Sequence, residues 1–184
     1  IDIKNLFFLL DAFALVVKRY PKAILLFVGD GDQREALERH AERNGLANHV
    51  IFAGKKQGED LYACYNIGQI FVLPSYYERF GAVVNEALLA GCYTLCSVVA
   101  GAACLIEPRK NGDLFDPASK TDLAEKLAEG LEDCEGLRQI SLKANKMGYS
   151  YFFFQSVKLY NRISKNGYSF ILGESLLGVS ETCF

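Results

Sequence analysis

Two glutamates with a glycine between them are the residues of this chain whose types and spacing could most clearly do chemistry. Glu78 and Glu86 are separated by seven residues, and Gly81 lies between them. Phe80, Gly81 and Ala82 are predicted to open a helix, where unpaired backbone N–H groups and the helix dipole attract phosphate. Glu86 would lie about 7 Å further along this helix, at roughly 1.5 Å per residue. The pattern therefore predicts a site for a phosphate followed by a hydroxyl-rich group.

A buried strand is expected to position these residues. The apolar run 70–73 comes directly before the first glutamate, so the order is strand, loop, glycine and helix. Open α/β sheets bind ligands at such strand-to-helix turns. Along the predicted helix, Ala82, Glu86 and Ala90 share one face, and the two small side chains would let a ligand lie close to the carboxylate.

Strands alternate with helices along the rest of the chain, and each predicted strand is apolar throughout. This pattern predicts a parallel sheet covered on both faces, in a Rossmann-like three-layer α/β domain over residues 1–165. Residues 166–184 carry no recognisable motif and are expected to form a C-terminal extension of unknown structure. The predicted strands are 23–28, 50–53, 70–73, 94–99 and 114–115; the predicted helices are 4–20, 32–44, 58–66, 81–90, 101–107 and 122–132, with two more within 136–165.

Composition limits the classes of function. The chain has 184 residues, 51% of them hydrophobic, and a formal net charge of −2, which indicates a globular domain and argues against nucleic-acid binding. Two histidines leave little material for a zinc site or a histidine-based triad. No apolar run approaches the roughly 20 residues that span a bilayer. Six cysteines without a metal-type pair predict free thiols and a cytoplasmic location.

Other candidate residues have two possible interpretations each. Gly29 and Gly31 follow the strand 23–28 and could face a ligand, or could only form a turn that needs positive φ. Arg34 stands where a dinucleotide-binding fingerprint has its further glycine, so that fingerprint is absent. Lys4, at the start of the first predicted helix, could bind phosphate or be solvated. The Glu78–Glu86 pair alone could be a loop carboxylate and a solvated helix residue.

The segment 74–91 resembles the donor-binding motif of retaining GT-B glycosyltransferases. The shared features are Pro74-Ser75 at the strand end, Glu78, Phe80-Gly81, Glu86-Ala87 and Ala90-Gly91. The resemblance extends over roughly residues 1–165 through further landmarks. These are Lys4 before Leu10-Asp11-Ala12-Phe13, the segments 26–31, 50–54, 100–102 and 105–107, and Asn111-Gly112.

This resemblance implies the C-terminal half of a GT-B fold, which binds a UDP-, GDP- or ADP-sugar. It implies that Glu78 contacts the donor sugar as the candidate catalytic residue, and that Glu86 contacts the ribose. Lys4 and the backbone amides of residues 80–82 would hold the diphosphate, with Gly29 and Gly31 also in the donor site. No cofactor or obligatory metal is implied, because amides and basic side chains would stabilise the leaving-group charge.

The resemblance also implies an N-terminal acceptor-binding domain outside this chain. The chain begins Ile-Asp-Ile-Lys, without a starting methionine, and we expect a fragment that is inactive in transfer by itself. Peripheral attachment to a membrane is an alternative for the full-length protein. Lys55 and Lys56 follow Gly54 and could approach the nucleotide base, although a solvated loop is the expected account.

Three positions depart from the family pattern and support an alternative function. Val98 stands where the family often has a polar residue, Cys104 where it commonly has glutamate, and Asp113 where it has a hydrophobic residue. The alternative is a degenerate, non-catalytic α/β module that binds a nucleotide or sugar. A phosphorylase or epimerase of GT-B fold would need a lysine-bound cofactor or other carboxylate placement, and neither is visible in the sequence.

Overall fold

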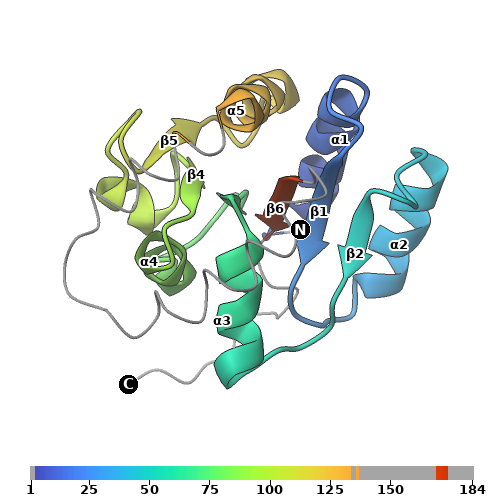
Figure 1. Ribbon diagram of the computed structural model, residues 1–184, viewed down its shortest axis with the longest axis horizontal. Helices are drawn as coiled ribbons and strands as arrows, with labels where there is room; N and C mark the ends of the chain where they lie inside the picture. The colour runs from blue at the N-terminus through green and yellow to red at the C-terminus, as the bar shows by residue number, and fades with distance from the viewer. Residues whose placement is uncertain (1–2, 134–135, 137–168, 174–184) are drawn as a thin grey trace.

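A computed structural model describes residues 3–133, 136 and 169–173. In these residues six strands form one sheet in the order β2-β1-β6-β3-β4-β5, and every neighbouring pair is parallel. The predicted α/β sheet is therefore confirmed (Figure 1). The strands are β1 (Ala23–Phe27), β2 (Val50–Phe52), β3 (Ile70–Leu73), β4 (Tyr93–Ser97), β5 (Gly112–Phe115) and β6 (Ser169–Gly173).

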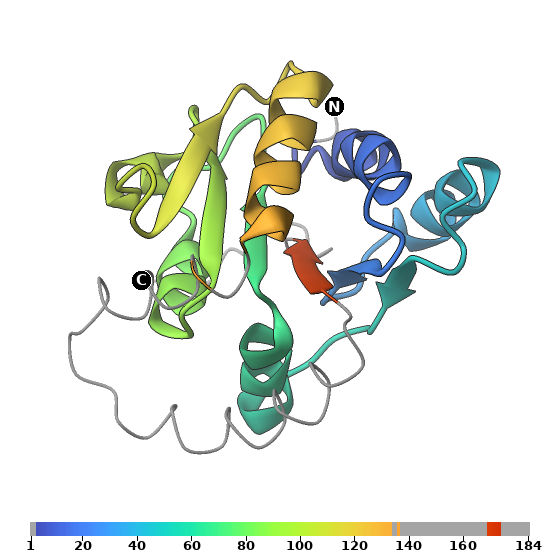
Figure 2. The same ribbon diagram turned by 45° about the horizontal axis from the view of Figure 1, so that its top comes forward.

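Helices cover both faces of this sheet. In the two views α1, α2 and α5 lie on one side, and α3 and α4 lie on the other (Figures 1 and 2). The helices are α1 (Leu6–Val17), α2 (Arg34–Arg43), α3 (Gly58–Ile67), α4 (Ala82–Leu89) and α5 (Lys120–Glu132), with a 3-10 helix, η1, at Gly101–Leu105. None of the helices within the described ranges has the length and apolar character needed to cross a membrane.

Alternate side chains of β1 and β3 enter two separate cores, which is why these strands are apolar throughout. Leu25 and Phe27 of β1 belong to the core beneath α1 and α5. Leu26 of the same strand belongs to the core that also contains Tyr65 of α3 and Val84 of α4. Because successive side chains of a strand point to opposite faces, a strand between two helical layers must be apolar on both.

Strand β6 corrects the expected domain boundary. The extension predicted over residues 166–184 is not separate from the domain at residues 169–173, because these form a strand between β1 and β3. Gly173 ends β6 beneath a phenylalanine ring, and a Cβ added there would lie 2.7 Å from Cε1 of Phe27. Except for Gly136, residues 136–165, where two helices are predicted, lie outside the described residues.

Two polar clusters tie elements together away from the strand ends that carry the candidate site. His40 of α2 and Lys120 of α5 both contact the carboxylate of Asp11 in α1, at 2.6 and 2.9 Å. Between the strands, the hydroxyl of Tyr93 in β4 donates to Asp113 in β5 at 2.6 Å. Burial, followed by this hydrogen bond, raises the pKa of Tyr93 well above its ordinary value, so its hydroxyl remains a donor.

Candidate functional site

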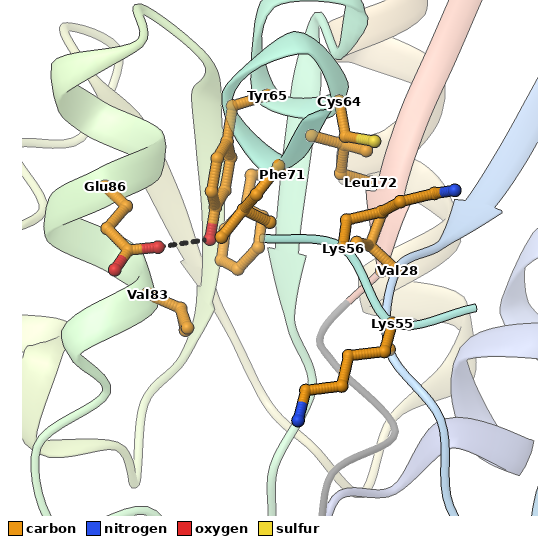
Figure 3. Close-up of a pocket in the computed structure, with 12 residues that line it drawn as sticks. Val28, Lys55, Lys56, Cys64, Tyr65, Phe71, Val83, Glu86 and Leu172 are labelled. Carbon is orange, nitrogen blue, oxygen red and sulfur yellow. Dashed lines mark hydrogen bonds between the residues drawn. The ribbon is translucent and has the colours of Figure 1, made fainter. Parts of the chain in front are cut away.

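A pocket of about 230 Å³ lies at the carboxyl end of β1 and β6 and reaches the first turns of α4. Parallel strands present their carboxyl ends at the same edge of a sheet, which is where open α/β sheets bind ligands. The pocket is mostly apolar, with a few charged side chains at its sides (Figure 3). It is lined by Val28, Gly29, Lys55, Lys56, Leu61, Cys64, Tyr65, Phe71, Val83, Glu86, Leu172 and Gly173.

Glu86 supplies the carboxylate of this pocket. It lies on α4 with its side chain exposed, and its Oε2 accepts a hydrogen bond from the Tyr65 hydroxyl at 2.9 Å. Figure 3 shows the two side chains pointing toward one another from neighbouring helices. The ring of Tyr65 is buried and lies 6.0 Å from the ring of Phe71, measured between centroids. One wall of the pocket therefore presents a carboxylate that can accept hydrogen bonds from hydroxyl groups.

Two lysines lie on the opposite side of the pocket. Lys55 and Lys56 follow β2, and in Figure 3 they lie across from Glu86. The expectation that they belong only to a solvated loop is therefore incomplete, because both side chains line the pocket. The pocket thus has an apolar floor, the Glu86 carboxylate as acceptor on one wall, and the lysine ammonium groups as donors on the other. Such a pocket suits a flat ring that carries polar groups at both ends.

Glu78 lies beside this pocket and does not line it. Its Oε2 is 3.0 Å from Nζ of Lys4, and the two side chains are 21% and 18% exposed. Its Oε1 accepts from the backbone N–H of Phe80 at 3.4 Å. Lys4, predicted to bind phosphate, thus reaches the carboxylate predicted to bind sugar.

The loop that carries Glu78 is fixed by two glycines. Gly81 caps α4 in the left-handed conformation, with φ of 87°. Gly101, at the start of η1, donates its N–H to the carbonyl of Glu78 at 3.0 Å. A Cβ at Gly101 would lie 2.0 Å from the carbonyl oxygen of Arg79, so only glycine allows this approach. The first turn of α4 follows directly on this loop, and its Val84 N–H donates to the carbonyl of Gly81 at 2.9 Å.

The structure divides the predicted site residues into two groups. Gly29 and Glu86 line the pocket, whereas Lys4, Gly31, Glu78, Phe80, Gly81 and Ala82 do not. Gly29 has a φ of 134°, and Gly31 donates its N–H to the side chain of Asp30 at 3.0 Å. The positive φ expected of a turn glycine is thus present at Gly29, which also lines the pocket, and is not present at Gly31. Phe80 and Ala82 are exposed.

Sequence reasoning missed five pocket residues: Leu61, Cys64, Tyr65, Leu172 and Gly173. The three from α3 have a signal in the sequence, since they lie on the short helix directly before β3. The two from β6 have none, because nothing in an apolar five-residue run specifies which strands it pairs with. Burial raises the pKa of the Cys64 thiol, which therefore stays neutral and acts as an apolar wall.

No group of three or more His, Cys, Asp or Glu side chains in the described part of the chain could hold a metal ion. The four cysteines at positions 64, 92, 96 and 104 are free thiols, as predicted. The positively charged groups near the site are instead lysines, at Lys4, Lys55 and Lys56.

Comparison with known proteins identifies the family. The sequence pattern of the family described as glycosyl transferases group 1 matches residues 2–147. The chain belongs to this family. This group 1 glycosyltransferase domain is 34% identical over 138 residues to the sulfoquinovosyl transferase SQD2 of Arabidopsis thaliana, which covers 73% of the domain and 26% of that protein.

Solved structures confirm the fold of the group 1 domain. Anabaena Alr3699/HepE, solved in complex with UDP-glucose, superposes with a TM-score of 0.70 at 27% identity, over 89% of this domain and 45% of that chain. Sucrose-phosphate synthase of Thermosynechococcus elongatus gives a TM-score of 0.71 at 26% identity, over 89% and 43%. The domain has the fold of the C-terminal half of a GT-B glycosyltransferase, and it spans less than half the length of each of these proteins.

The three departures from the family pattern have different local structures. Val98 and Cys104 are exposed at the carboxyl edge of the sheet and on η1. Asp113 is buried in β5 with its carboxylate bonded to Tyr93. The change at Asp113 therefore has a structural account within this domain. Nothing in the structure explains the other two.

Proposed function

We propose that this domain binds a nucleoside-diphosphate sugar as the donor for retaining glycosyl transfer. The observation that carries the proposal is the position of Glu86, whose carboxylate faces an apolar pocket beside the start of α4, with two lysines opposite. A similar structure, Anabaena Alr3699/HepE, was solved with UDP-glucose, which supports this class of ligand. The Glu86 carboxylate suits the ribose hydroxyls, and the N-terminus of α4 suits the diphosphate. The two lysines suit the polar edge of the base, so the three parts of the nucleotide could bind in one continuous site.

Each part of the donor has a proposed partner. The ribose hydroxyls donate to Glu86, and the diphosphate lies against the first turn of α4 and the Lys4 ammonium. The sugar lies near Glu78, which is the proposed catalytic residue. Because Lys4 now contacts Glu78, a diphosphate would share this ammonium with the carboxylate. Cations and oriented amides placed where leaving-group charge develops would stabilise the transition state.

Calorimetric titration of the chain with UDP, GDP and ADP tests the binding proposal. Glu86→Gln keeps the shape of the side chain and removes its charge, and hydrogen bonds to a charged group contribute about 1.5–3 kcal/mol. We therefore expect about ten- to hundredfold weaker binding. Glu35→Gln on α2 is the matched control, since Glu35 is 84% exposed and pairs with Arg39 in its own helix. Failure of all three nucleotides to bind would refute the proposal.

The acceptor side of the reaction is proposed to lie outside this chain, in the longer part of the protein that relatives possess. We expect the isolated domain to bind donor without transferring sugar, and a longer protein that includes an acceptor domain to transfer it. The proposal includes no obligatory metal ion. Binding measured in EDTA and again in Mg²⁺ should therefore agree, and a strict requirement for Mg²⁺ would contradict this part.

A non-catalytic donor-binding module is the second candidate. The exposed apolar Val98 and the thiol of Cys104, at positions where the family has polar groups, favour it. This candidate predicts donor binding by both the domain and the longer protein, with no sugar transfer by either. Transfer by the longer protein would exclude it.

A further inference from the structure

We propose that Tyr65 is a positioning residue that holds the Glu86 carboxylate in place to accept the ribose hydroxyls. This inference rests on the proposed function, because it assigns the residue that prepares the same site. The hydroxyl of Tyr65 donates to Oε2 of Glu86 at 2.9 Å. The donor comes from α3 and the acceptor from α4, so the contact joins the two helices that cover this face of the sheet (Figure 3).

Among the described residues, Tyr65 is the one side chain that is hydrogen-bonded to the Glu86 carboxylate. Glu86 is exposed on α4, and the residues four positions before and after it are Ala82 and Ala90, whose side chains can neither pack along it nor donate to it. A glutamate on an open helix face samples several rotamers, and a ligand that selects one of them loses affinity. A fixed donor reduces this loss before the ligand arrives.

Tyr65 is itself held firmly enough to act as this donor. Its side chain is 6% exposed, and its ring packs near Phe71 of β3. Its backbone carbonyl accepts from the thiol of Cys92, at 3.2 Å, just before β4. The hydroxyl is thus the outward end of a ring buried in the core, and its position follows from the sheet rather than from the ligand.

The arrangement leaves the carboxylate able to bind. A carboxylate has about four acceptor positions, and Tyr65 occupies one of them on Oε2. Oε1 and the second position of Oε2 remain for two vicinal hydroxyls. A tyrosine hydroxyl is a neutral donor, so it positions the carboxylate without placing a positive charge beside it.

The experiment compares two ligands on one variant. Tyr65→Phe keeps the buried ring and removes the hydroxyl, and Tyr62→Phe on the same helix is the matched control because Tyr62 does not line the pocket. Binding is measured by calorimetry for whichever of UDP, GDP and ADP binds most tightly, and for its 2′,3′-dideoxy form. We expect Tyr65→Phe to weaken binding of the ribonucleotide about three- to tenfold, as when a ligand must immobilise one long side chain. The dideoxy nucleotide should bind the wild-type chain and the variant equally.

Four results would overturn the inference. Equal weakening for both ligands would mean that Tyr65 supports the fold only. An unchanged ribonucleotide affinity in Tyr65→Phe, with weakening in Glu86→Gln, would remove Tyr65 and leave the proposed function intact. Absence of any nucleotide binding by the wild-type chain would overturn both proposals. Tyr65→Phe added to Glu86→Gln should cause no further loss, and independent, additive losses would also refute the coupling.

If Tyr65→Phe does not fold, the partner residue provides the same test. Glu86→Asp shortens the side chain by one methylene and leaves Tyr65 in place, so the carboxylate can no longer reach the hydroxyl. The same selective weakening of the ribonucleotide is expected. An unchanged affinity for the ribonucleotide would refute the positioning role.

Discussion

Gly101 gives the sharpest single-residue test of how the Glu78 loop is held. A Cβ at this position would meet the carbonyl oxygen of Arg79 at 2.0 Å, whereas real Cβ contacts essentially never fall below 3.0 Å. The neighbouring atom is backbone, so no side chain can rotate away. Gly101→Ala must therefore push the loop back by about 1 Å or more, which would break the hydrogen bond from Gly101 to the Glu78 carbonyl.

The expected effect falls mainly on the sugar half of the donor. Overpacking of this kind costs about 1–3 kcal/mol of folding stability. A misplaced Glu78 would lose a charge-assisted hydrogen bond to the sugar, about 1.5–3 kcal/mol. We expect UDP-glucose to bind about ten- to hundredfold more weakly to Gly101→Ala, and UDP itself to change much less, because Glu86 and its pocket are not moved.

The assay is paired calorimetry with UDP and UDP-glucose, together with a crystal structure of the variant. Gly45→Ala is the control for a loss of stability alone. Gly45 has a φ of 72° and no atom lies within 4 Å of a Cβ there, so this substitution strains the backbone without a clash and far from the Glu78 loop. The reasoning is refuted if residues 78–80 keep their positions in Gly101→Ala and the affinity for UDP-glucose is unchanged.

Three further predictions concern stability and are read from urea unfolding. Burial opposes ionisation of Asp11, but its histidine and lysine partners outweigh this and lower its pKa, so Asp11→Asn should lose about 0.5–1 kcal/mol at pH 7. This difference should vanish as the pH falls below about 4, where the wild-type carboxylate also becomes protonated, and a difference that persists at pH 2 would contradict it. Tyr93→Phe should lower the free energy of unfolding by about 1–3 kcal/mol, because Asp113 loses its buried donor. Adding Asp113→Leu to this variant should recover part of the loss. Gly173→Val should cost about 1–3 kcal/mol or more by displacing the Phe27 ring, and an unchanged midpoint would argue against the β6 register.

Local patterns predicted most of the fold. The strand 70–73 was predicted with the bounds that β3 has, because an apolar run between Gly68-Gln69 and Pro74 has clear ends on both sides. The helix before β2 ends as predicted near Gly45, whose positive φ requires glycine. The strand predicted over 94–99 ends at Ser97 instead, since a turn follows in which the Ala100 N–H donates to the Ser97 carbonyl.

The candidate site was only partly predictable, and the reason is the range of the interactions. Glu86 and Gly29 were found because each sits at a strand-to-helix turn with a local signature. The pairing of Lys4 with Glu78 joins residues 74 positions apart, and sequence spacing does not contain it. Tyr65 reads as an ordinary buried aromatic residue until the fold places its hydroxyl beside Glu86.

Strand β6 sets the order in which the domain can be completed. Strands β1 and β2 form one part of the sheet, β3, β4 and β5 form another, and β6 alone is hydrogen-bonded to both. A nascent chain must therefore keep two open sheet edges until residues 169–173 have left the ribosome, since Ala23 pairs with Ser169. Such sequence-distant pairing slows folding and exposes edges that other chains can join. The edges of β1 and β3 that β6 later closes are thus the last part of this sheet to be paired during synthesis.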